Sequence, residues 1–177
     1  MNAANNYAKA IFLLTEELGT TESALNDVNV CKEIFESNPS YVTLTDTPAL
    51  TPDEKIALIS EAFSSVDASV INLIKILCEK HSVYLFSEIA KEYVSLYNDA
   101  RGICPAEVIS AIPLDEGRMS AIKSKLEALT GKTIIIKNTV EPSVLGGIKL
   151  RYMGKQIDGS LKSRLDKIDA GLKNTIL

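Results

Sequence analysis

Apolar residues recur at helical spacing through the first hundred residues. Tyr7, Ile11, Leu14 and Leu18 lie three or four positions apart, which predicts one face of a helix that ends at Gly19. Similar patterns predict further helices over about 21–37, 41–44, 51–64, 67–80 and 83–100. The sequence Thr51-Pro52-Asp53-Glu54 has the residues of a capping box, with proline at the first helical position. This part of the chain therefore predicts a helical bundle.

The pattern changes after Arg101-Gly102. Strands are predicted over 107–112, 133–140 and 148–153, with a two-residue turn at Gly154-Lys155. Amphipathic helices are predicted over 115–130 and 160–173; the apolar side of the first consists of Met119, Ile122, Leu126 and Leu129. We predict an α+β fold, mainly α, in which an N-terminal bundle (1–104) precedes a small C-terminal α/β domain (105–177).

The predicted helix over 67–80 carries apolar residues around most of its circumference: Val70, Ile71, Leu73, Ile74, Ile76, Leu77 and Cys78. A helix that faces a single core needs only one apolar stripe. Two interpretations remain open at this point. The helix is either buried at the centre of the bundle, or one side of it faces a groove that receives a partner's amphipathic helix.

Charge is distributed unevenly around the predicted boundary. Residues 1–105 hold 7 basic and 15 acidic residues, a net charge of −8, whereas residues 106–177 hold 12 and 8, a net charge of +4. The asymmetry is typical of two units that face different partners, although it also fits two units that simply remain soluble.

Few residues suggest a catalytic, metal-binding or phosphate-binding site. Cys31, Cys78 and Cys104 are far apart and form no metal-ligand motif, so we expect neither a metal site nor a disulfide framework. His81 is the single histidine and is expected to lie at a helix end. Gly131-Lys132-Thr133 lacks the remainder of a phosphate-binding loop and follows a helix, so Gly131 is interpreted as a helix C-cap. We expect no catalytic residue, no cofactor and no small-molecule substrate.

The basic residues of the C-terminal part allow an alternative function, that of a free cytosolic nucleic-acid-associated adaptor. These residues are Lys149, Arg151, Lys155, Lys162, Arg164, Lys167 and Lys173. Aspartates are interleaved with them, and Tyr152 is the single aromatic residue among them, whereas single-strand binders stack bases on several aromatic side chains. We therefore expect no nucleic-acid partner.

Three segments resemble the delta subunit of F-type ATP synthases, the family of the mitochondrial oligomycin-sensitivity-conferring protein. The opening Tyr7-Ala8-Lys9-Ala10-Ile11-Phe12 is similar to the family's YAKALF-type start. Residues 72–77, NLIKIL, resemble its central bundle helix, and residues 145–160, LGGIKLRYMGKQIDGS, followed by Arg164-Leu165, resemble its C-terminal signature. The resemblance extends over essentially the whole chain.

This resemblance implies a six-helix N-terminal bundle and a non-catalytic stator subunit. In the family, the bundle holds the N-terminal helix of an alpha subunit of the catalytic head, and the C-terminal domain binds the b subunits of the peripheral stalk. In this sequence, Tyr7 and Ile76 match the family's groove positions, and helical spacing places further expected groove residues beside them: Ala10, Ile11, Leu14, Leu73, Leu77 and Lys80. The C-terminal signature residues are Gly146, Gly147, Asp158, Gly159 and Arg164.

The sequence departs from the family where Lys80-His81-Ser82-Val83 replaces the usual Asn-Gly-Arg-Leu. The turn after the central helix is therefore expected to differ. No apolar run approaches the roughly 18 residues of a membrane span, and the N-terminus lacks the basic region of a signal peptide. We expect a bacterial protein that lies peripherally on the cytoplasmic face of the inner membrane.

Overall fold

The computed structural model describes residues 3–47, 50–161 and 163, and the chain divides into two compact units, 1–97 and 98–177. This division falls within the last turn of a helix that ends at Ala100, before the predicted boundary at 104/105. The described residues are mainly helical with a small sheet, as predicted. The sheet has four strands, one more than the three predicted, because residues 155–158 also form a strand.

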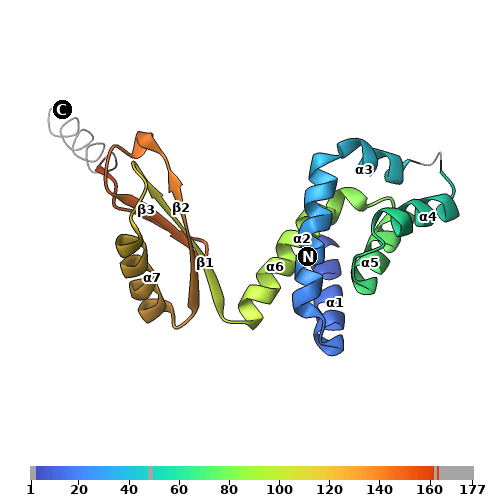
Figure 1. Ribbon diagram of the computed structural model, residues 1–177, viewed down its shortest axis with the longest axis horizontal. Coiled ribbons are helices and arrows are strands. Elements are labelled where there is room, and N and C mark those ends of the chain that lie inside the picture. The colour runs from blue at the N-terminus through green and yellow to red at the C-terminus, as the bar shows by residue number, and fades with distance from the viewer. Residues whose placement is uncertain (1–2, 48–49, 162, 164–177) are drawn as a thin grey trace, which may run out of the picture. The chain divides into compact units, whose positions relative to one another are not determined.

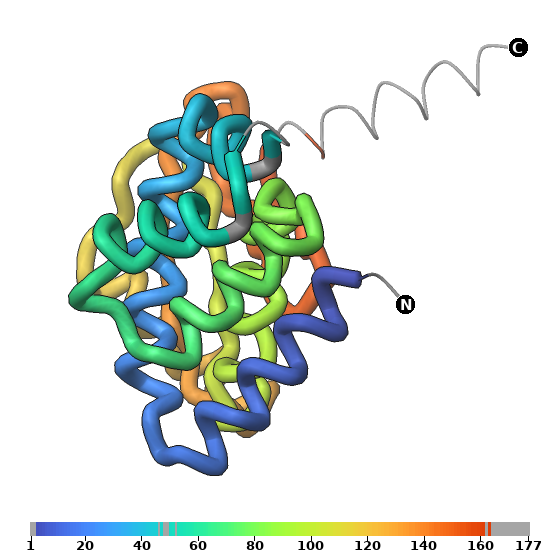
Figure 2. The backbone as a smooth tube through the Cα atoms, turned by 90° about the vertical axis from the view of Figure 1, so that its right-hand side faces the viewer, coloured from blue at the N-terminus to red at the C-terminus, as the bar shows by residue number. Residues whose placement is uncertain are grey.

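Helices form the first unit (Figure 1). They are α1 (Ala3–Leu18), α2 (Thr21–Ser37), α3 (Pro39–Asp46), α4 (Pro52–Ala62), α5 (Ala68–Glu79), the 3₁₀ turn η1 (Val83–Leu85) and α6 (Phe86–Ala100). Gly19 (φ 70°) ends α1, and the chain returns as α2 beside it (Figure 2). The capping box at Thr51 is present, and the Asp67 carboxylate caps α5 by accepting a hydrogen bond from the Ser69 N–H.

Aromatic side chains and one buried polar network organise the core of this unit. The Phe35 ring lies 5.0 Å from Phe86 and 5.5 Å from Phe63, between ring centroids. The hydroxyl of Tyr93, which is fully buried, lies 2.8 Å from the Thr15 hydroxyl and donates to the Thr21 carbonyl. Because the buried hydroxyls of Tyr93 and Thr15 are hydrogen-bonded, the cost of removing them from water is offset, and α6 is fixed against the α1–α2 corner.

The second unit is a sheet with a helix on one face (Figure 1). Its elements are β1 (Ile103–Ser110), α7 (Glu116–Thr130), β2 (Thr133–Val140), the 3₁₀ turn η2 (Pro142–Val144), β3 (Ile148–Tyr152) and β4 (Lys155–Asp158). The strand order is β2-β1-β3-β4; β1 and β2 are parallel, and the other pairs are antiparallel. Cys104, Ala106, Ile134 and Leu126 form the core between the sheet and α7.

Several sequence predictions for this unit are wrong in detail. β1 begins four residues earlier than predicted, at Ile103, and ends at Ser110. It accommodates Pro105 because β3 pairs only from Ala106 onward, so the missing N–H faces no partner strand there. Leu129 is not on the core side of α7 but is 77% exposed.

The β3–β4 turn is formed by Met153-Gly154 rather than by Gly154-Lys155. Tyr152 pairs with Lys155, and both residues between them have positive φ, 48° at Met153 and 70° at Gly154. Two consecutive positive φ values are typical of a type I′ hairpin, whose twist matches that of the strands. The predicted helix over 160–173 lies mostly outside the described residues.

Candidate partner-binding surfaces

Helices α1 and α5 pack together and bring most of the predicted groove residues to one part of the first unit. Ile11 and Leu73 are buried between the helices, at 5% and 6% exposure. Ala10, Leu14, Ile76 and Lys80 are exposed, and Tyr7 is half-buried. We call the set of Tyr7, Ala10, Leu14, Ile76 and Lys80 the α1–α5 face.

Two large apolar side chains on this face are open to solvent. Leu14 and Ile76 are each 44% exposed. Val70, Ile74 and Leu77 of the same helix α5 are fully buried. Helix α5 is therefore largely buried in the core of the first unit, as the first interpretation expects, and presents Ile76 outward.

Leu77 differs from the sequence expectation. Its side chain is fully buried in the core of the first unit and does not reach the surface. It supports the α1–α5 face from beneath, together with Ile11 and Leu73. Leu18, the last member of the predicted α1 stripe, is 58% exposed, because the buried side of α1 is formed instead by Ala4, Ala8, Ile11, Phe12 and Thr15.

The turn that departs from the family pattern closes α5 with a Schellman motif. The Ser82 N–H bonds the Leu77 carbonyl (2.8 Å), and the His81 N–H bonds the Cys78 carbonyl (3.1 Å). His81 occupies the left-handed position with φ 51°, where glycine is usual. The prediction of a helix-end position for His81 is confirmed.

The C-terminal signature residues meet at the end of the sheet. Gly147 has φ 75°, and a Cβ on it would lie 2.5 Å from the Gly159 carbonyl oxygen, so both a positive φ and a close backbone approach require glycine. The Asp158 carboxylate accepts the Ser160 N–H and lies 4.0 Å from the Lys149 ammonium. Arg164 lies outside the described residues.

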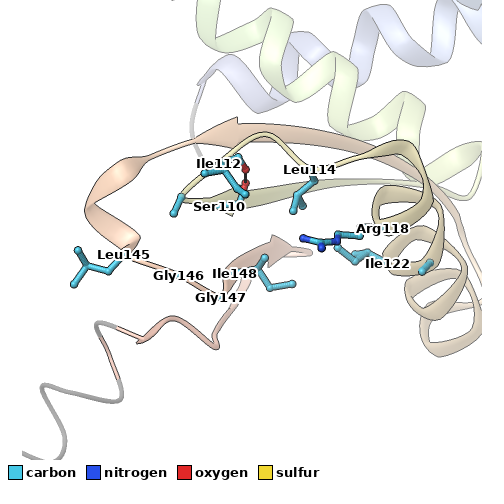
Figure 3. Close-up of a pocket in the computed structure, with 11 residues that line it drawn as sticks. Ser110, Ile112, Leu114, Arg118, Ile122, Leu145, Gly146, Gly147 and Ile148 are labelled. Carbon is cyan, nitrogen blue, oxygen red and sulfur yellow. Dashed lines mark hydrogen bonds between the residues drawn. The ribbon is translucent and has the colours of Figure 1, made fainter.

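Gly146 and Gly147 also line an open cavity of about 470 Å³ (Figure 3). Arg118, Ala121 and Ile122, spaced by one turn on α7, form one wall. Most of the remaining lining is apolar: Ala111, Ile112, Leu114, Leu145 and Ile148. At its rim, Ile112 and Leu145 are 63% and 65% exposed, and Leu145 has φ 63°, which is rare for leucine. Neither residue was among the predicted site residues, since sequence patterns do not reveal which side chains line a cavity.

Most charged side chains on the sheet have partners. Arg151 pairs with Glu107 at 3.3 Å and bonds the Gln156 amide oxygen, while Glu107 also accepts from the Thr139 hydroxyl. With Lys149 beside Asp158, two of the basic residues proposed for nucleic acid are engaged by carboxylates. Such pairing leaves less positive charge for a phosphate backbone.

Burial shifts the pKa values of three ionisable groups in the first unit. Burial, followed by the nearby Asp27 carboxylate, raises the pKa of the Cys31 thiol to about 12, so this thiol stays protonated at neutral pH. Burial likewise raises the pKa values of Tyr41 and Tyr93. Over 3–47, 50–161 and 163, no three histidine, cysteine or carboxylate side chains gather as a metal site would require.

The described structure is that of a helical unit followed by a small α/β unit, each with apolar side chains exposed at its surface. The chain belongs to the ATP synthase delta (OSCP) subunit family, whose model matches residues 3–172. It is thus a non-catalytic subunit of that enzyme complex.

Relatives named ATP synthase subunit delta agree with this assignment. Those of Priestia megaterium and Leuconostoc citreum are 34% and 32% identical, each over 96% of this chain and 94% of the relative. The relative of Flavobacterium johnsoniae is 32% identical over 97% of both chains. These matches favour the subunit over the nucleic-acid alternative.

The fold also resembles that of a chain in the Toxoplasma gondii mitochondrial ATP synthase hexamer. The TM-score is 0.75 at 15% identity, and the match covers 97% of this chain and 98% of the other. Among the helices formed by described residues, none has the length and apolar character to cross a membrane.

Proposed function

We propose that the chain is a stator subunit that ties the catalytic head of a rotary F-type ATP synthase to its peripheral stalk. The first unit acts as a six-helix bundle, α1–α6, that binds the N-terminal helix of an alpha subunit. The second unit binds the b subunits. The link prevents the head from turning with the rotor, and it requires attachment surfaces rather than reactive groups.

The exposed Ile76 on a mostly buried helix carries this proposal. An amphipathic helix laid along the α1–α5 face would remove Leu14 and Ile76 from water, a gain of about 25 cal/mol per Å² of apolar surface. Lys80, exposed at the end of α5, would contact the polar side of that helix. The packing of Ile11 and Leu73 beneath fixes the face before binding, which reduces the ordering cost.

The second unit contributes the other attachment. Its open apolar cavity and the exposed Ile112 and Leu145 supply apolar area at one end of the unit. Gly147, Asp158 and Gly159 act by shaping the backbone there. A subunit of this kind works peripherally, and the bacterial relatives favour a place on the cytoplasmic face of the inner membrane.

Substitution of Ile76 by aspartate tests the attachment to the head. We expect Ile76→Asp to weaken binding to catalytic heads stripped of their own delta subunit by about 100-fold, or roughly 3 kcal/mol, because a charge would be buried in the contact. Co-sedimentation with such heads measures this affinity, and circular dichroism verifies the fold.

Leu44→Asp is the matched control, since Leu44 lies on α3 and is 43% exposed, almost the same as Ile76. It should bind like the unsubstituted chain. If a folded Ile76→Asp variant binds as tightly as Leu44→Asp, the α1–α5 face is not the attachment site.

A further inference from the structure

The sheet of the second unit has two edges, which differ in length and character. Strand β4 forms one edge; it has four residues and carries Lys155 and Asp158 at its ends. Strand β2 forms the other edge; it has eight residues, TIIIKNTV, with a single charged side chain and no proline. Short strands, charges and prolines protect a sheet edge from pairing with another chain. The edge of β2 is therefore the less protected one.

Every second residue of β2 directs its backbone groups away from β1. Thr133 and Glu141, at the two ends of the strand, both donate their N–H toward the β1 side. Because backbone groups alternate in direction along a strand, the even-numbered residues face outward. Ile134 is the first of these, and its N–H donates to the Glu127 carboxylate at 3.2 Å. The start of the edge is thus closed by a side chain of α7.

The next three outward residues, Ile136, Asn138 and Val140, have open backbone groups. Within the part of the chain that the structure describes, no residue bonds their outward N–H or C=O. Strand β2 packs mainly against β1, which lies on its inner side, and against α7, which lies over one face. An open row of donors and acceptors in a strand is a template for pairing with another strand.

A second copy of this chain offers a matching row. When two β2 strands pair antiparallel about a two-fold axis, outward residues lie opposite outward residues. An axis at Asn138 places this residue opposite Asn138 of the second copy, and Ile136 opposite Val140. Each of these residue pairs exchanges two N–H···O bonds, so every open backbone group of the three residues gains a partner.

Two other registers are less favourable. An axis at Ile136 would place Asn138 opposite Ile134, whose N–H is already bonded. An axis at Lys137 would place the two Lys137 side chains directly opposite each other, and like charges in that position are destabilising. The Glu127 carboxylate and the Lys137 ammonium therefore both favour the axis at Asn138.

The side chains also match in this register. On the face toward α7, Ile136 meets Val140 of the second copy, which is 44% exposed in the single chain. On the other face, Lys137 lies opposite Thr139 and diagonally across from Glu141, within reach of a long side chain. Lys137 and Glu141 are both exposed, and the two-fold axis repeats their contact. Charge complementarity thus adds to the backbone pairing.

We propose that two copies of this chain associate through the edges of β2, in antiparallel register about Asn138, and form one continuous sheet from their two four-stranded sheets. One pair of strands buries less than the roughly 1,200 Å² of a standard interface, so the dimer is weak, with a dissociation constant between about 1 μM and 1 mM. This association concerns free copies of the chain and does not depend on the stator function.

Sedimentation velocity of the full chain tests the proposal through a charge exchange. From about 10 μM to about 1 mM, the average mass should rise from that of one copy toward that of two. Lys137→Glu should weaken association roughly ten-fold, because it places a carboxylate near Glu141 of the second copy. Lys137→Glu/Glu141→Lys in one chain should restore it, because the opposite charges meet again.

A single copy at all of these concentrations would overturn the proposal. So would a dimer that dissociates equally in the unsubstituted chain, the single variant and the double variant, because the charges would then lie outside the contact.

A second variant tests the backbone pairing. Val140→Pro removes an outward N–H and leaves the bonds to β1 in place, and proline is tolerated at such edge positions. It should weaken association roughly ten-fold, whereas Val140→Thr, which keeps the N–H, should not. Circular dichroism verifies that both variants fold. Ile76→Asp should leave association unchanged; association abolished by Ile76→Asp would place the contact on the α1–α5 face and overturn the proposal.

Discussion

At the scale of single residues, positive φ values decide several local structures. Met153, His81 and Leu145 adopt them without being glycine. Left-handed backbone costs a non-glycine residue about 1 kcal/mol or more, so each position carries a local energetic penalty. His81 adopts a positive φ where the chain closes α5, and Leu145 adopts one at the rim of the cavity.

Met153→Asn should stabilise the second unit. Asn-Gly is the preferred pair for a type I′ turn, and Met153 is 56% exposed, so little packing is lost. We expect a gain of about 0.5–1 kcal/mol in the free energy of unfolding, measured by urea denaturation. Gly154→Ala, at φ 70°, is the control and should act in the opposite direction. A destabilised Met153→Asn variant would refute the turn assignment.

At the scale of elements, the N-terminus of α4 is stabilised by its capping box. The Thr51 hydroxyl accepts the Glu54 N–H, and the Glu54 carboxylate accepts the Thr51 N–H at 2.8 Å. Thr51→Ala should reduce stability by about 1 kcal/mol, because orphan N–H groups lose a partner. Thermal unfolding of the full chain measures this loss, with Thr43→Ala on α3 as a threonine control outside a cap.

The stability that this capping box contributes depends on pH, because the Glu54 carboxylate is one of its members. Its hydrogen bonds from the Thr51 N–H and hydroxyl lower the pKa of Glu54 from 4.5. A lowered pKa in the folded state stabilises the protein at pH values above 4.5, and this contribution disappears as the pH falls through the lowered pKa. Thr51→Ala retains the bond from the backbone N–H and removes the bond from the hydroxyl, so it loses the hydroxyl's share of this contribution. The difference between the unsubstituted chain and Thr51→Ala should therefore become smaller in acid. A difference that grows in acid would contradict this account.

The sequence largely predicted which segments form helices and which form strands, whereas it did not predict the exact residues at which they begin and end. Helical spacing predicted α1 and α5, and β-branched residues predicted β2 with its observed bounds. The start of β1 was missed because Pro105 argues against a strand, and only the strand pairing shows that its position lacks a second neighbour. The Met153-Gly154 turn was missed because methionine is an unusual residue at positive φ.

Surface exposure was the least predictable property of the candidate site. Spacing alone places Leu77 and Ile76 on adjoining parts of α5, yet one is fully buried and the other is 44% exposed. This difference arises from how the neighbouring helices pack around α5, which one-dimensional patterns do not encode. The cavity at Gly146 escaped prediction for a similar reason, since it lies between elements remote in sequence.

At the scale of the whole molecule, two units of opposite charge are joined in one chain. The N-terminal part is acidic and helical, and the C-terminal part is basic and built on a sheet. The family match extends across both, from residue 3 to residue 172, so the two units form one conserved architecture rather than a chance fusion. Two separate attachment surfaces are what a link under load requires.

Calorimetric titration tests the central claim most directly. The titrant is a peptide of roughly the first 20 residues of the cognate alpha subunit, enough for about five helical turns. The account predicts one-to-one binding with Kd below about 1 μM, or roughly −8 kcal/mol, and loss of that binding in a folded Tyr7→Ala/Ile76→Asp variant. Absence of binding by the folded, unsubstituted chain, or equal binding by the double variant, would contradict it.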